Sequence, residues 1–324
     1  MLLNDTHHRD RGAAIVRVVA SLASIVLFTA CGESSQNVPV ASHPLDPNPA
    51  LTIGAQEDRP ARVVLPKDYN IQRKYPLVIL LHGYGANAAE QDFIFHLAQR
   101  TTTYQFILVL PDGTPDSKGM LFWDATPECC NFYGHPPVDD VGYIAALMKE
   151  AMSIYAVDSK RIRLVGHSNG AYMSYRYICE HPVPVDRIVV LAGSVYLDPS
   201  SCRDPKPVDI VHTQGTADDT VLYEPNLPPN ADPNHINTVG AEAAIGRWAH
   251  VAGCAEPPDL IESRDYFQAL TVDGNPAETE IYRFHGCTSG KRIELWKSIG
   301  ADHTFIMPPS NDRWRDDVAA FVSE

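Results

Sequence analysis

From Ala61 onward, short apolar runs alternate with longer amphipathic stretches, and this alternation restricts the fold more than any other feature. The run Pro76–Leu81 (PLVILL) is almost entirely apolar, which is typical of a parallel strand buried on both faces. Similar runs predict strands at 106–110, 161–165, 187–191, 208–212, 280–284 and 291–298, and helices at 88–100, 140–155, 168–180, 241–251 and 312–322. The pattern predicts an α/β fold with a mostly parallel, doubly wound sheet and helices on both faces.

One strand-to-helix junction contains a serine between two glycines. The run 161–165 ends in Gly166-His167-Ser168-Asn169-Gly170, which fits the G-x-S-x-G pattern of a nucleophile elbow. Such a turn forces the serine into an unfavourable backbone conformation, and flanking glycines avoid collisions with the neighbouring strand and helix. The plain alternative is a serine that only caps the helix. Because a strand is predicted before it and a helix after it, we expect Ser168 to be a nucleophile.

A serine nucleophile needs a base and a residue that orients the base. The expected chain order is serine, then acid, then histidine. Among the histidines that follow the acid candidates, His303 comes just after an apolar strand and before the last helix, where the base is expected. Asp218 and Asp219 both end a predicted strand, and their positions leave both open as the acid. Asp302 is a poor candidate because it is adjacent to His303.

Acyl transfer also needs preorganised N–H donors for the oxyanion. One predicted donor is the backbone N–H of Asn169, which follows the nucleophile. The other is the N–H of Tyr84, in the loop His82-Gly83-Tyr84-Gly85 after the run 76–81.

The first fifty residues differ from the rest of the chain. Three arginines precede the uncharged stretch 18–30, which is too short for a membrane span and fits a signal peptide. It ends in FTACG, which resembles a bacterial lipoprotein cleavage box and predicts lipidation of Cys31. An ordinary signal peptide is the alternative. We therefore expect a signal peptide at 1–30, a proline-rich tether at 31–50, and a single catalytic domain at 51–324. The predicted location is a membrane-anchored lipoprotein in the cell envelope, or otherwise a periplasmic or secreted protein.

Six cysteines remain after Cys31, an even number that predicts disulfides in an exported protein. They are Cys129, Cys130, Cys179, Cys202, Cys254 and Cys287. The favoured pair is Cys254–Cys287, since both follow a glycine next to an apolar segment; the adjacent Cys129 and Cys130 could pair with each other or with two other cysteines. No histidine or cysteine has zinc-like spacing, so no metal site is predicted. The net charge of −14, without a basic patch, argues against a nucleic-acid partner. The oligomeric state is not predicted.

Several longer motifs occur together and in a fixed order. They are LLHGYGAN, VLPDG, FWDATPECC, VDDVGYI, VDSKRIRLVGHSNGAYMSYRYICE, GTADDTV and HTF. With these motifs, the chain from about Ala61 to Pro308 resembles the polyhydroxybutyrate depolymerase-like esterases, relatives of the feruloyl and acetylxylan esterases in the α/β-hydrolase superfamily.

By matching position, the resemblance implies Ser168 as nucleophile, His303 as base and Asp218, rather than Asp219, as acid. It also implies that no cofactor is needed. Gln214 stands where the family often has histidine, and Phe305 replaces a common tryptophan. Trp123, Tyr84 and Phe305 are candidates for the substrate pocket.

The function expected from these features is that of an exported serine esterase that hydrolyses carboxylic esters through an acyl-enzyme. Its partner would be a small ester, an oligomeric polyester or a plant cell-wall ester, with the membrane as a second partner through a lipid on Cys31. A serine peptidase and a catalytically inactive binding protein on the same fold are the alternatives.

Overall fold

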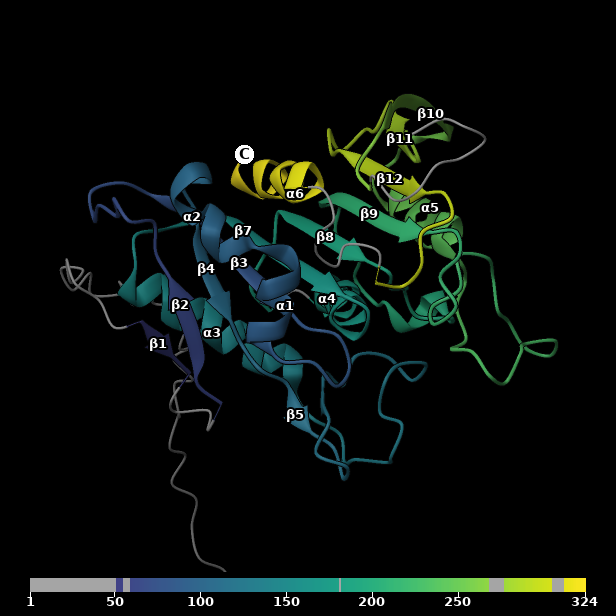
Figure 1. Ribbon diagram of the computed structural model, residues 1–324, viewed down its shortest axis with the longest axis horizontal. Coiled ribbons are helices and arrows are strands. Elements are labelled where there is room, and N and C mark those ends of the chain that lie inside the picture. Colours follow the sequence, from purple (N-terminus) through teal and green to yellow (C-terminus); the bar gives the residue numbers. More distant parts are fainter. Residues whose placement is uncertain (1–50, 55–58, 181, 268–276, 305–311) are drawn as a thin grey trace, which may run out of the picture. The chain divides into compact units, whose positions relative to one another are not determined.

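The computed structural model describes residues 51–54, 59–180, 182–267, 277–304 and 312–324 (Figure 1). The predicted signal peptide and tether, Cys31 and Phe305 lie outside the described residues. Within them, ten strands form one sheet. Their spatial order is β1 (Thr52–Ile53), β2 (Ala61–Val64), β4 (Ile107–Leu110), β3 (Tyr75–Leu81), β7 (Val157–His167), β8 (Arg187–Leu191), β9 (Asp209–Gly215), β12 (Ile293–Ser298), β11 (Thr279–His285) and β10 (Ala255–Arg264). A small hairpin, β5 (Thr114–Pro115) and β6 (Leu121–Phe122), lies apart from it.

The central strands, from β4 to β12 in spatial order, are all parallel, and the strands at both edges are antiparallel. Helices α1 (Ala88–Phe95), α2 (Leu97–Tyr104) and α6 (Asp312–Ser323) pack on one face of the sheet (Figure 1). Helices α3 (Asp140–Ile154), α4 (Asn169–Glu180) and α5 (Ala241–Val251) pack on the other. The predicted α/β fold with a mostly parallel sheet covered on both faces is therefore confirmed.

Strand β3 shows why its sequence is apolar throughout. Leu77, Ile79 and Leu81 belong to the core under α3, α4 and α5, whereas Val78 and Leu80 belong to the core under α1, α2 and α6. Successive side chains point to opposite faces of a strand, so a strand covered on both sides has no polar position.

The short strands β1, β2, β5 and β6 were not predicted, and two further differences have a physical reason. The helix expected at 88–100 is two helices, because His96 between α1 and α2 adopts a left-handed conformation with φ of 53°. Strand β10 was not predicted, because Pro257 and Pro258 resemble a loop. It lies at the edge of the sheet, where prolines are tolerated since one side of the strand needs no ladder hydrogen bonds.

The described cysteines form three disulfides, Cys129–Cys130, Cys179–Cys202 and Cys254–Cys287. The predicted Cys254–Cys287 pair is confirmed, and of the two arrangements open for Cys129 and Cys130 the vicinal pair is present. No described helix combines the length and the apolar composition that crossing a bilayer requires.

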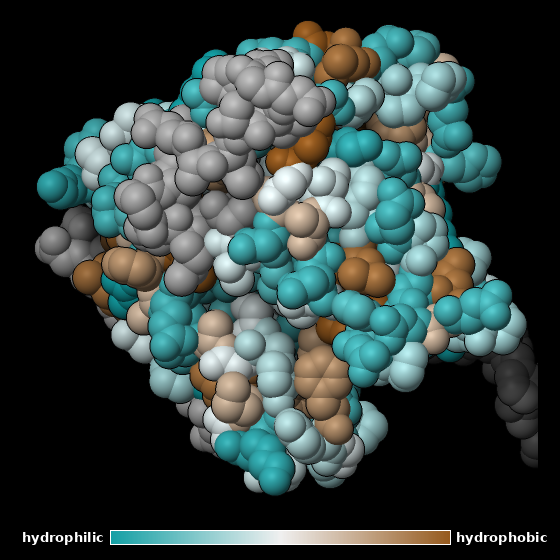
Figure 2. Space-filling view, turned by 45° about the vertical axis from the view of Figure 1, so that its right-hand side comes forward, coloured by the Kyte–Doolittle hydropathy of each residue, from teal (hydrophilic) through white to brown (hydrophobic). Residues whose placement is uncertain are grey.

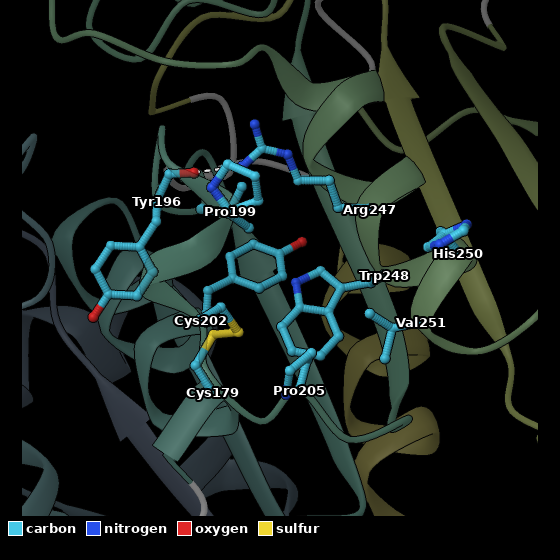
Figure 3. Close-up of a pocket in the computed structure, with 11 residues that line it drawn as sticks. Cys179, Tyr196, Pro199, Cys202, Pro205, Arg247, Trp248, His250 and Val251 are labelled. Carbon is cyan, nitrogen blue, oxygen red and sulfur yellow. Dashed lines mark hydrogen bonds between the residues drawn. A yellow bond between two sulfur atoms is a disulfide. The ribbon is translucent and has the colours of Figure 1, made fainter.

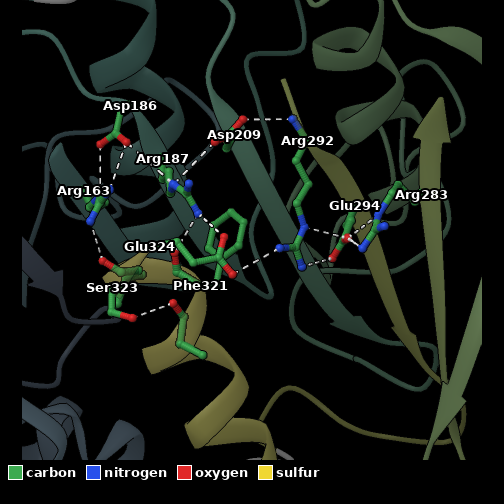
Figure 4. A network of polar contacts seen from close by, with 12 residues as sticks. Arg163, Asp186, Arg187, Asp209, Arg283, Arg292, Glu294, Phe321, Ser323 and Glu324 are labelled. Atoms are coloured by element: carbon green, nitrogen blue, oxygen red, sulfur yellow. Dashed lines mark hydrogen bonds and ion pairs between the residues drawn. The ribbon is translucent and has the colours of Figure 1, made fainter. Parts of the chain in front are cut away.

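At the amino ends of the parallel strands, a polar network holds the end of α6 (Figure 4). The Arg163 side chain is 1% exposed; it donates to both carboxylate oxygens of Asp186, at 3.0 and 3.1 Å, and to the carbonyl of Val322 at 2.7 Å. Arg187 donates to the carbonyl of Phe321 at 3.0 Å. The last carbonyls of a helix have no intrahelical donor and carry partial negative charge, so these arginines stabilise α6 in place.

Candidate active site

Ser168 lies between the end of β7 and the start of α4, with φ of 53°. Its N–H donates to the carbonyl of Leu191 in β8 at 2.8 Å. Its carbonyl accepts the N–H groups of Ala171 and Tyr172, at 2.9 and 3.1 Å. A non-glycine residue in the left-handed region is strained, and here a neighbouring strand and the following helix hold it in that conformation. This is the backbone arrangement of a nucleophile elbow.

The glycines on either side of the elbow are needed for close approach. A Cβ atom on Gly166 would collide with the carbonyl oxygen of Gly170, and a Cβ atom on Gly170 would collide with the carbonyl oxygen of Leu81. Any larger residue at either position would push α4 away from β7 and β3. The predicted reason for the flanking glycines is therefore found in the structure.

Beyond β9 and β12, Asp218 and His303 come together. The Nδ1 atom of His303 lies 2.9 and 3.0 Å from the two carboxylate oxygens of Asp218. One of these oxygens also accepts the N–H groups of Thr220 and Val221, both at 2.9 Å. Asp218 is 3% exposed, so its carboxylate is fixed and largely shielded from water.

The other acid candidates lie elsewhere. The side chain of Asp219 is exposed and contacts the hydroxyl of Thr220. Asp302 is also exposed and accepts the N–H of Thr304 at 2.8 Å. Of the three aspartates, only Asp218 is within hydrogen-bond distance of the His303 ring.

His303 lies next to the elbow. The Nε2 atom of His167, the residue before Ser168, is 3.2 Å from the carbonyl oxygen of His303, and the two rings are 5.1 Å apart. Burial, with a smaller contribution from the neighbouring His303, lowers the pKa of His167 to about 3. His167 is therefore neutral near pH 7, and in the tautomer with a proton on Nε2 it donates to the carbonyl of His303.

The loop after β3 lies on the other side of Ser168. A Cβ atom on Gly83 would be only 3.4 Å from the Cβ of Ser168, and the N–H of Gly83 donates to the side chain of Gln91 at 2.9 Å. Neither the N–H of Tyr84 nor that of Asn169 donates a hydrogen bond to any residue of the described ranges. Two backbone donors next to the serine are thus left for an external acceptor.

The side chain of Asn169 joins the elbow to the loop after β3. It accepts the N–H of Trp123 at 2.7 Å and donates to the Trp123 carbonyl at 2.9 Å. The Trp123 indole N–H in turn donates to the carbonyl of His82 at 3.0 Å. Trp123 is fully buried, with no surface on which a substrate could lie. The prediction that Trp123 lines the substrate pocket therefore disagrees with its place in the core, where it holds the loop of Tyr84.

Aromatic side chains that were not predicted lie beside this loop. Phe132 packs edge-on against Tyr84, with ring centres 5.0 Å apart, and both Phe132 and Tyr133 are 51% exposed. The Tyr84 hydroxyl donates to Asp116 at 2.6 Å; burial, followed by this contact, raises the pKa of Tyr84, which keeps the hydroxyl protonated.

On the face shown in Figure 2, hydrophobic atoms occur in small separate groups within a mostly hydrophilic surface. Loop residues carry no periodic signal, which is why the sequence did not reveal this group.

A buried chain of hydrogen bonds leads from α4 to Asp218. Tyr175 on α4 bonds Nδ1 of His212 at 2.8 Å, and Nε2 of His212 bonds the side-chain oxygen of Gln214 at 3.0 Å. The Gln214 amide donates to the carbonyl of Val221, whose own N–H donates to Asp218. Burial lowers the pKa of His212 to about 4, so the chain consists of neutral groups. Gln214 therefore supports the turn that contains Asp218.

The described residues contain no cluster of three His, Cys, Asp or Glu side chains that could hold a metal ion. Residues 54–317 match the family model described as "Putative esterase". The chain belongs to this esterase family.

The chain is 26% identical over 247 residues to Feruloyl esterase B of Piromyces equi, in an alignment that covers 74% of this chain and 42% of that protein. It is 24% identical over 233 residues to the bifunctional acetylxylan esterase/xylanase XynS20E of Neocallimastix patriciarum, which covers 63% of this chain and 32% of that protein. The chain therefore spans less than half the length of these two relatives.

Among solved structures, the esterase is similar to an acetyl xylan esterase from Aspergillus awamori, with a TM-score of 0.58 and 16% identity. The match covers 86% of this chain and 99% of that one. At this identity the similarity shows the fold alone, which is the α/β-hydrolase fold.

Proposed function

We propose that this esterase is an exported serine hydrolase that cleaves carboxylic esters through an acyl-enzyme. The observation that carries the proposal is the contact between His303 and Asp218, at 2.9 Å, beside a serine on a strained elbow. A nucleophile, a base and an orienting carboxylate from three separate segments are the parts that this chemistry requires.

In the proposed reaction, Nε2 of His303 takes the proton of the Ser168 hydroxyl as Oγ attacks the ester carbonyl carbon. The negative charge that forms on the carbonyl oxygen is held by the N–H groups of Asn169 and Tyr84. The C–O bond then breaks, and His303 returns the proton to the departing alcohol. The same histidine then deprotonates a water that attacks the acyl carbon; the acyl C–Oγ bond breaks, His303 returns the proton to Ser168 Oγ, and the acid is released. Asp218 stabilises the cationic form of His303.

We propose aromatic and acetyl esters of the plant cell wall as the first substrates to test, since feruloyl and acetylxylan esterases are among the relatives. The half-exposed aromatic side chains Phe132 and Tyr133 support an apolar acyl or alcohol group near the site. Initial rates on ethyl ferulate, acetylated xylan and 3-hydroxybutyrate oligomers would rank the candidates. A clear preference for the hydroxybutyrate oligomers would favour the polyhydroxybutyrate depolymerase-like subtype.

Two controls separate this function from its alternatives. A serine peptidase would cleave a matched amide as well as p-nitrophenyl butyrate, whereas an esterase would cleave only the ester. An inactive binding protein would not react with a fluorophosphonate probe. We expect labelling of the esterase and its loss in Ser168→Ala.

Export is supported by the three disulfides of the described residues, which are typical of oxidising compartments. We propose that Cys31 carries the lipid. Metabolic labelling with a fatty acid analogue should mark the wild-type protein and not Cys31→Ala; labelling of neither would leave an ordinary signal peptide as the better interpretation.

A further inference from the structure

A second site lies away from Ser168, between α4, α5 and the segment 195–205 (Figure 3). It is a cavity of about 250 Å³. Its wall on α4 includes Tyr175 and Cys179, which follow Ser168 by about 10 and 16 Å along the helix axis at a rise of about 1.5 Å per residue. None of the residues proposed to act on the ester lines it.

The walls of the cavity are apolar and firmly held. The rings of Tyr175 and Trp248 lie nearly parallel, with centres 6.1 Å apart. The disulfide Cys179–Cys202 ties α4 to the opposite wall, which also contains Pro199. A cavity of about 150 Å³ is enough for benzene, and drug-sized ligands need about 300 Å³ or more. The space therefore suits one ring, or a branched chain, with a short arm.

Trp248 provides a hydrogen-bond donor inside this apolar space. The residue is 3% exposed, yet its indole N–H donates to no residue in the described part of the chain. In Figure 3 the indole nitrogen faces the middle of the group of lining residues. The acceptor for this N–H can therefore be water or a ligand that occupies the cavity.

Arg247 brings a positive charge to the same cavity. Its guanidinium donates to the carbonyls of Tyr196 and Leu197, which hold it in place, and it forms no salt bridge with any described carboxylate. The nearby Asp198 accepts both the N–H and the hydroxyl of Ser200, at 2.9 and 2.7 Å. Burial lowers the pKa of Arg247, although an arginine remains charged at neutral pH. Among the described carboxylates, Asp198 attracts the guanidinium from beyond ion-pair distance.

We propose that this cavity binds a small apolar carboxylate, with its ring or branched chain against the apolar walls that include Tyr175 and Trp248, and its carboxylate on Arg247 and the Trp248 N–H. One cation matches one negative charge, whereas a doubly charged phosphate would bring an uncompensated charge into apolar walls. A neutral ester or amide would use the indole N–H but not the guanidinium. The site is independent of ester cleavage and goes beyond the proposed function.

The test is calorimetric titration of the enzyme with 3-phenylpropanoate after Ser168 has been blocked with a fluorophosphonate. Blocking prevents the ligand from binding in the active site, so one remaining site per chain is the expected result. If Ser168 does not react, the proposed function fails, but the same titration on the Ser168→Ala protein still tests the cavity. Binding that disappears when Ser168 is blocked, or no binding at all, would overturn the proposal.

Variants assign the site to the cavity. Trp248→Phe keeps the ring and removes the donor, and should weaken binding about fivefold. Arg247→Gln removes the charge and should weaken it about tenfold or more. Arg62→Gln, at a side chain 56% exposed on β2, is the matched control and should change nothing.

A ligand comparison covers the case in which a variant does not fold. The neutral 3-phenylpropanamide should bind the wild-type enzyme about tenfold more weakly than the carboxylate. Equal affinity for both ligands, or affinity unaffected by both cavity variants, would contradict the proposal.

Discussion

The two ends of the parallel strands carry opposite kinds of polar chemistry. At the amino ends, Arg163 and Arg187 are bonded to carboxylates and to the last carbonyls of α6. At the carboxyl ends, the N–H groups of Tyr84 and Asn169 have no partner among the described residues, and Ser168 is held in a strained conformation. One end is held by ion pairs and by hydrogen bonds to the last carbonyls of α6 and stabilises the fold, while the other keeps donors available for a ligand. Open α/β sheets place their ligands at this second end.

The largest effect should come from the carboxyl ends. Ser168→Ala removes the nucleophile and should lower kcat by about 10⁴–10⁶-fold. The free energy of unfolding should stay unchanged or rise slightly, because the strained elbow loses only a hydroxyl. Rates on p-nitrophenyl butyrate and urea unfolding curves measure the two quantities. A variant with a tenth of the wild-type activity would show that Ser168 is not the nucleophile.

The opposite result is expected at the amino ends. Arg163→Met leaves the Val322 carbonyl without its donor and Asp186 with only its longer ion pair to Arg187, at 3.6 Å, and should lower the free energy of unfolding by about 2–3 kcal/mol. This is below the about 3–5 kcal/mol for a fully buried pair, because the Asp186 side chain is 24% exposed. At temperatures where the variant is folded, kcat/KM should be nearly that of wild type. Arg161→Met, at a half-exposed ion pair with Asp158, is the control and should cost less than about 1 kcal/mol. A comparable loss in both variants would remove the special role of Arg163.

Gln214→Met tests whether a buried hydrogen-bond chain affects both stability and activity, because it breaks the chain that ends at Asp218. It leaves Nε2–H of His212 and the Val221 carbonyl unpaired, and should lower the free energy of unfolding by about 1–3 kcal/mol. Because Val221 holds Asp218, we also expect kcat to fall about tenfold with little change in KM. The pH profile of kcat separates the roles, since a purely structural Gln214 would leave the apparent pKa of the base unmoved. A variant that is less stable but keeps the wild-type kcat and its pH profile would show that Gln214 stabilises the fold and has no effect on catalysis.

The effect that should be smallest at neutral pH is that of His212 on the pH dependence of stability. His212 has a folded pKa of about 4 and an unfolded value near 6.5, so below pH 6.5 the unfolded chain binds a proton that the folded protein does not. Stability is therefore present above about pH 6.5 and is lost as pH falls toward 4, by up to about 1.4 kcal/mol per pH unit from this residue. His212→Gln should make that slope shallower, as measured by unfolding curves between pH 4 and 7. An unchanged slope would show that His212 already carries a proton in the folded protein.

The strands and the elbow could be predicted because their signals are local. The apolar residues of Pro76–Leu81 and the glycines around Ser168 reflect contacts that any parallel strand or tight elbow must make. The choice between Asp218 and Asp219 is different in kind. It depends on which carboxylate the turn 218–221 directs toward His303. The side chains of adjacent turn residues point in different directions, and the local sequence pattern does not show which of them faces His303.

Features made by residues distant in the sequence carried no signal. Tyr175 on α4 and His212 on β9 meet only in the fold, and each alone has the appearance of an ordinary core residue. Trp123 was expected in a pocket because aromatic residues occur both in substrate pockets and in the core. Only its burial in the structure assigns it to the core. Strand β10 was missed because proline is excluded from central strands. At the edge of a sheet proline is tolerated, so this rule does not apply to β10.

Asn169 has a consequence for how the two backbone donors behave. Its own N–H is one of them, and its side chain holds Trp123, which in turn holds the His82 carbonyl in the loop of the other donor. The spacing between the donors is thus set by one asparagine and one tryptophan and not by two independent loops. A motion that separates the two N–H groups has to break the hydrogen bonds of Trp123 first. The two donors should therefore move together.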